Sequence, residues 1–239
     1  MGIAICCAII GWGNETNPIF NAIKPVRSDE PADQVMTGTG IEEPAPKELT
    51  DALRLANQTH NIVFRRYGDD NIMPYLHVTL VFIYHLTFYP QAMAHLAPEF
   101  PWELLALMLN TLLNSCKSYS RIESERFPQS GKGDLPRPLP EDYAMRGLLW
   151  VDRYFPGDWF SNDKIDDEEK YFEVASMTEE RKIRVLHLAC RISAQGCKWL
   201  RYNPETHQFI VRPRHDSEQD ATTPESNDYG ELPDAAVNA

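Results

Sequence analysis

The chain has 239 residues, of which 43% are hydrophobic and 10% aromatic, enough for one large or two small cores. This composition excludes disorder of the whole chain, and the formal net charge of −12 disfavours unselective binding of polyanions. Five cysteines without a CxxC pair predict neither a disulfide framework nor a zinc site.

Residues 1–46 are predicted to form an irregular N-terminal segment. Residues 3–10 are apolar but too short to cross a bilayer, and they lack the basic start of a secretory signal. Residues 11–47 mix Gly, Pro, Asn and acidic residues without periodicity, which is typical of a linker.

Regular helical spacing begins near Pro46. Apolar residues recur there every three or four positions, and Arg65 and Arg66 follow at the end, so the pattern predicts an amphipathic helix. Residues 71–98 contain no charged residue, and a second apolar run follows at 104–113. Because Pro74, two histidines and two threonines interrupt the centre of the first run, and the second is too short to span a bilayer, we expect a buried helical hairpin rather than a membrane span.

The segment 139–150 predicts a buried helix. Pro140 suits the first turn, and Glu141 and Asp142 suit the positive end of the helix dipole. Apolar residues up to Trp150 supply buried surface, and an aromatic corner follows at 154–160. The proline-rich stretch 128–140 and the acidic stretch 161–170 are expected to be loops.

A last long helix is predicted over 178–192, with Thr178 as its N-cap and Gly196 as its stop. The segment 199–211 suggests a short extended end. The predicted helical domain therefore covers 47–214. Residues 215–239 carry seven acidic residues and no Lys or Arg, which predicts a disordered acidic tail.

Basic residues on this last helix are the strongest candidate site. Arg181, Arg184 and Arg191 fall within about a quarter turn of one another, and Lys198 joins them if the helix continues. Such a stripe contacts successive phosphates of a nucleic acid. The alternative is a solvated helix face that pairs with the acidic segment 161–180.

Catalytic patterns are few. His187 lies among leucines and is expected in the core, and His77 and His85 are eight residues apart, which is not a helical metal pair. The acidic residues of 163–169 are contiguous in a loop, unlike the dispersed ligands of a metal-dependent nuclease. We therefore expect no catalytic residue, metal or cofactor.

One family resembles the chain over residues 70–212. The motifs are Leu-Pro-Glu-Asp at 139–142, Arg-Gly at 146–147, Tyr-Phe-Pro at 154–156 and Arg-Lys-Ile-Arg at 181–184. They resemble the helical DNA/RNA-binding domain of the ever-shorter-telomeres type, found in telomerase-associated proteins and nonsense-mediated mRNA decay factors, and they are most similar to its fungal branch.

This resemblance implies an all-α, right-handed solenoid-like array of antiparallel helix pairs with disordered termini. It covers only the C-terminal part of that family's helical region. It implies a non-catalytic scaffold in the nucleus or cytoplasm, with RNA or telomeric DNA and proteins of RNA-decay or telomerase complexes as partners, and no membrane.

Two functional hypotheses follow from the sequence. In the first, a basic face binds phosphates through six residues: Arg181, Lys182, Arg184, Arg191, Lys198 and Arg201. In the second, the chain is a protein–protein adaptor with no direct nucleic-acid binding, and a groove between helix pairs holds a partner segment through apolar anchors. Steep salt dependence would distinguish the first from the second.

Overall fold

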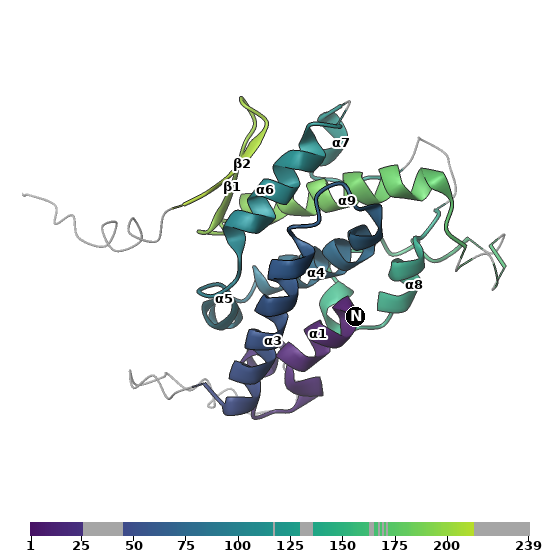
Figure 1. Ribbon diagram of the computed structural model, residues 1–239. Helices are drawn as coiled ribbons and strands as arrows, with labels where there is room; N and C mark the ends of the chain where they lie inside the picture. Colours follow the sequence, from purple (N-terminus) through teal and green to yellow (C-terminus); the bar gives the residue numbers. More distant parts are fainter. Residues whose placement is uncertain are drawn as a thin grey trace, which may run out of the picture.

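Helices dominate the computed structural model, which confirms the predicted mainly helical class (Figure 1). The structure describes residues 1–25, 45–116, 118–129, 136–162, 165–166, 168, 170 and 172–212. Five helices form most of the body: α1 (Gly2–Ile9), α3 (Lys47–Val63), α4 (Met73–Leu86), α6 (Trp102–Leu113) and α9 (Ala175–Ala194). Shorter elements join them: α2 (Pro18–Ile23), α5 (Pro90–Leu96), α7 (Ser120–Glu123), α8 (Pro140–Met145) and the 3₁₀ turns η1 (Gly11–Gly13), η3 (Asp70–Ile72) and η4 (Leu149–Val151).

Helix α4 is the centre of the core. It contains no Asp, Glu, Lys or Arg and almost all of its side chains are buried, because it contacts α1, α5, α8 and α9 on different sides (Figure 1). The apolar runs of 71–113 form the buried helices α4 and α6, with the short helix α5 between them, but both helices pack on α9 rather than mainly on each other as the predicted hairpin. Within the described residues, no helix combines the length and the apolar character needed to cross a membrane.

The N-terminal prediction was wrong for residues 1–25, and residues 26–44 of the predicted segment lie outside the described residues. Residues 1–25 form α1, η1 and α2 instead of an irregular segment, and they bury Ile5, Ile9, Ile19 and Ile23 in the common core. Asn17 joins the two helices, since its side chain accepts a hydrogen bond from the Phe20 N–H at 3.0 Å and donates to the Ile9 carbonyl at 2.9 Å. Asn followed by Pro is a common helix start, but both residues are also typical of loops, so the composition of this segment favoured a loop.

Two helix boundaries also differ from the prediction. The helix of 139–150 ends at Met145, and Gly147 then takes a positive φ of 83° before the chain enters η4. Helix α9 begins at Ala175, so Thr178 lies inside it and does not cap it. The helix ends at Ala194, so Lys198 is not on its face.

A small antiparallel hairpin, β1 (Leu200–Asn203) and β2 (Gln208–Val211), confirms the extended end. Both of its edges are capped by helical side chains. Asn110 of α6 donates to the Phe209 carbonyl at 2.9 Å and accepts from the Phe209 N–H at 2.8 Å. On the other edge, the Tyr202 N–H donates to Ser193 Oγ of α9 at 2.8 Å. The predicted tail, 215–239, lies outside the described residues.

Candidate functional site

The predicted phosphate-binding face is not a surface. The side chains of Arg181 and Arg184 are each only 2% exposed, because this side of α9 packs against α4 and meets the acidic start of α8. The helix periodicity correctly placed the two arginines on one face, but periodicity alone cannot show whether that face meets solvent or another helix. This part of the prediction was wrong.

Arg181 lies between two carboxylates. Its Nε and Nη2 donate to Glu141 of α8 at 2.6 and 2.9 Å, and its Nη1 and Nη2 donate to Glu173 at 2.6 and 3.3 Å. Glu141 is buried, whereas the Glu173 side chain is 55% exposed. Burial alone lowers the pKa of the guanidinium, but the bonds to Glu141 and Glu173 outweigh it and raise that pKa above its ordinary value.

Arg184 pairs with Asp142 in the interior. The Asp142 Oδ2 accepts from Arg184 Nη1 at 3.3 Å, from the Leu139 N–H at 2.9 Å and from Trp159 Nε1 at 3.1 Å. The guanidinium of Arg184 also lies 4.3 Å from the centre of the Phe127 ring and 4.5 Å from that of Trp159. Asp142 therefore caps α8 and compensates the buried charge of α9 at once.

His77 extends this network into α4. Its Nδ1 hydrogen-bonds Glu141 Oε1 at 3.0 Å and its Nε2 hydrogen-bonds the Tyr154 hydroxyl at 2.7 Å. Burial raises the pKa of Glu141, but the hydrogen bonds from His77 and Arg181 outweigh burial and hold that pKa below its ordinary value. The Pro-Glu-Asp start of α8 therefore ties α4 to α9.

The other four predicted residues are dispersed. Lys182 pairs with Glu179 at 3.0 Å on α9, and Arg191 is half-buried near the other end of that helix. Lys198 and Arg201 are exposed at the hairpin. In the alternative interpretation, α9 is a solvated face that pairs with the acidic segment 161–180. The pairs Lys182–Glu179 and Arg181–Glu173 agree with it, but Arg181 is buried rather than solvated.

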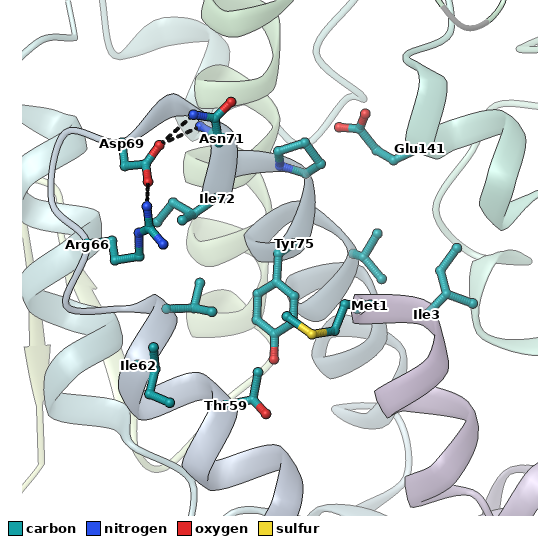
Figure 2. A pocket seen from close by; sticks show the side chains of 14 residues that line it. Met1, Ile3, Thr59, Ile62, Arg66, Asp69, Asn71, Ile72, Tyr75 and Glu141 are labelled. Atoms are coloured by element: carbon teal, nitrogen blue, oxygen red, sulfur yellow. Dashed lines mark hydrogen bonds and ion pairs between the residues drawn. The ribbon is translucent and has the colours of Figure 1, made fainter.

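An open pocket of about 680 Å³ lies where α1, α3 and α4 meet. Figure 2 shows Met1 and Ile3 at the start of α1 on one side, Thr59 and Ile62 of α3 on another, and Tyr75 of α4 between them. Glu141 lines the α8 side. The wall is largely aliphatic or aromatic, and the Ile62 side chain is 67% exposed at its mouth.

Polar groups around the pocket already have partners within the chain. Asp69 accepts from the Arg66 guanidinium at 2.5 Å and from the Asn71 side chain at 2.9 Å (Figure 2). Behind the wall, the Tyr75 hydroxyl bonds His60 Nδ1 at 2.9 Å. Burial lowers the pKa of His60 to about 4, so this histidine is neutral at pH 7. The pocket therefore presents mainly apolar surface, and the charged side chains that line it, Arg66, Asp69 and Glu141, are all paired.

Sequence reasoning missed this pocket because its walls come from segments about 60 residues apart. The only local signal was Leu55 and Ile62, two apolar residues outside the buried stripe of α3. Comparison with protein-family models, curated proteins and solved structures finds no match for this chain.

Proposed function

We propose that this protein is a non-catalytic helical adaptor that binds an apolar segment of a partner protein at the α1–α3–α4 pocket. The observation that carries the proposal is an open, largely apolar cavity of about 680 Å³ whose polar neighbours are already hydrogen-bonded. Binding cavities commonly have volumes of about 300–1,000 Å³, so this one accommodates one or two large side chains.

The exposed side of α3 extends the pocket into a binding surface. Leu55, Thr59 and Ile62 are spaced at i, i+4 and i+7, which places them along one face of the helix, and Arg66 lies just beyond its C-terminal end. Leu55 is 56% exposed and Ile62 is 67% exposed. A partner helix that lies along this stripe and inserts a side chain into the pocket uses a common mode of peptide recognition.

The resemblance to scaffolds of the ever-shorter-telomeres type supports an adaptor. Under this proposal, the helices form part of a right-handed array of antiparallel pairs, and the side-by-side placement of α1 with α3 and of α4 with α9 supports it (Figure 1). The ion-pair network then serves the scaffold by joining three helices. The partners expected from the resemblance are proteins of RNA-decay or telomerase complexes.

Site-specific photo-cross-linking tests the adaptor proposal. A photoreactive amino acid replaces Ile62 in one variant and Leu107 in a control variant. Leu107 lies on α6, is 54% exposed and is therefore matched in chemistry and exposure. The adaptor predicts one dominant protein cross-link from position 62, with the attached residue in an apolar segment, and none of that species from position 107. Equal products from both positions would contradict it.

A second candidate function is contact with RNA through the hairpin. Lys198 and Arg201 are exposed, and no ion pair joins either of them to another residue in the part of the chain that the structure describes. Fluorescence anisotropy with single-stranded RNA, across a salt series, tests this function. Salt-dependent binding that is lost in a Lys198→Glu/Arg201→Glu variant would favour it.

A further inference from the structure

The two edges of the Arg181 guanidinium have different kinds of partners. The side edge, Nε and Nη2, is held by Glu141, which is 7% exposed and also bound by His77. The end edge, Nη1 and Nη2, is covered by Glu173, whose side chain is 55% exposed and belongs to the segment before α9. The first partner is fixed in the interior, and the second lies at the surface.

The charge balance of the network does not require Glu173. Arg181 and Arg184 already face Glu141 and Asp142 one to one, so Glu173 is a third carboxylate beside two cations. A buried pair that loses one partner leaves an uncompensated charge, but removal of Glu173 leaves both arginines compensated. Its contact with Arg181 can therefore be exchanged for that of another anion.

We infer that the end edge of Arg181 is a binding site for a carboxylate of a partner protein, and that Glu173 occupies it in the free chain. The planar fork of an arginine matches two carboxylate oxygens, and Glu173 shows that a carboxylate fits here, since both of its oxygens accept from Arg181. The binding step is an exchange of one carboxylate for another.

The surroundings of this site favour an acidic residue flanked by apolar ones over a polyanion. Residues 161–180 hold eight acidic residues and two lysines, a balance that repels a nucleic-acid backbone. Phe172 and Val174 flank Glu173 and are 61% and 37% exposed. They offer apolar contact to an incoming segment. This site shares only Glu141 with the α1–α3–α4 pocket and does not depend on the proposed adaptor function.

A peptide that copies the chain's own segment tests the exchange. The probe has the sequence of residues 171–175, an amidated C-terminus and an uncharged fluorophore, so its glutamate is its only carboxylate. A tethered competitor acts at about millimolar effective concentration, so the Glu173→Gln variant of the full chain should bind the probe more tightly than the wild type, by about tenfold if the Kd of the variant is about 0.1 mM.

Two controls define the site. The Glu179→Gln variant removes another exposed glutamate, which pairs with Lys182 instead, and it should bind the probe as the wild type does. A probe with glutamine in place of glutamate should not bind the Glu173→Gln variant. Equal affinity of wild type and Glu173→Gln for the acidic probe, or equal binding of both probes, would overturn the inference.

Two further results would also overturn it. The first is tighter binding of single-stranded RNA than of the acidic probe by the Glu173→Gln variant, because the site would then select a polyanion. The second is loss of helical circular dichroism in both Glu173→Gln and Glu173→Ala, because the exchange requires Glu173 to be dispensable for folding.

Discussion

The Asp142–Arg184 pair allows a quantitative test of the interior network. Asp142→Asn keeps the volume of the side chain but removes the charge that faces Arg184 Nη1. Arg184→Met removes the cation and its contacts with the Phe127 and Trp159 rings. Breaking a buried pair by removal of one partner costs about 3–5 kcal/mol, so each single variant should lose about 3 kcal/mol of unfolding free energy.

The double variant should lose less unfolding free energy than the sum of the losses in the two single variants. No uncompensated charge remains when both partners are replaced, so the expected coupling free energy is about 2 kcal/mol. Urea unfolding followed by circular dichroism at pH 7 measures all four proteins. Arg54→Met is the matched control, because Arg54 pairs with Asp51 at the surface, and such pairs contribute about 0.5 kcal/mol or less.

Additive losses in the double variant would refute this reasoning. So would a loss in Arg184→Met no larger than that in Arg54→Met. Either result would mean that the Asp142–Arg184 pair is solvated in solution, and the basic face of α9 would again be available to phosphates.

Two further predictions concern the buried histidines and the hairpin. Burial lowers the pKa of His60, His85 and His187 to about 4, below the ordinary value of about 6.5. Between about pH 6.5 and 4 the unfolded chain therefore binds more protons than the folded chain, and the free energy of unfolding falls as the pH falls. Lowering the pH from 7.5 to 5.5 should reduce the free energy of unfolding by about 1.4 kcal/mol per histidine. Urea midpoints that do not change between these pH values would contradict this prediction. Asn110→Ala removes both hydrogen bonds to Phe209 and should cost about 1–3 kcal/mol. Hydrogen exchange should rise at 208–211, but Thr111→Ala, whose hydroxyl bonds only within α6, should leave it unchanged.

Much of the helical framework was predictable from local signals. Proline at the first turn marked α8, the apolar runs marked α4 and α6, and Gly196 followed the end of α9. These signals depend on chain stereochemistry within a few residues. They fail where two local patterns compete, as at Asn17-Pro18, where turn-forming residues are also a helix start.

The candidate site was less predictable, because its chemistry depends on contacts distant in sequence. A basic stripe at helical spacing has the same pattern whether it faces water or an acidic partner. Here Glu141 and Asp142, about 40 residues before Arg181 and Arg184, decide the outcome. A covered face needs compensating acids, so the adjacent acids at the start of α8 were the signal that pointed to this pairing. The pocket had no comparable signal.

The salt dependence of partner binding tests the central claim most directly, namely that recognition uses the apolar pocket rather than a basic face. The partner identified by cross-linking from position 62 is titrated against the wild type, Ile62→Glu and Lys198→Glu/Arg201→Glu between 50 and 500 mM salt. We expect the Kd of the wild type to change by less than about threefold over this range. Binding should be lost in Ile62→Glu and kept in the double variant. A steep loss of affinity with salt, together with loss of binding in the double variant alone, would contradict the account.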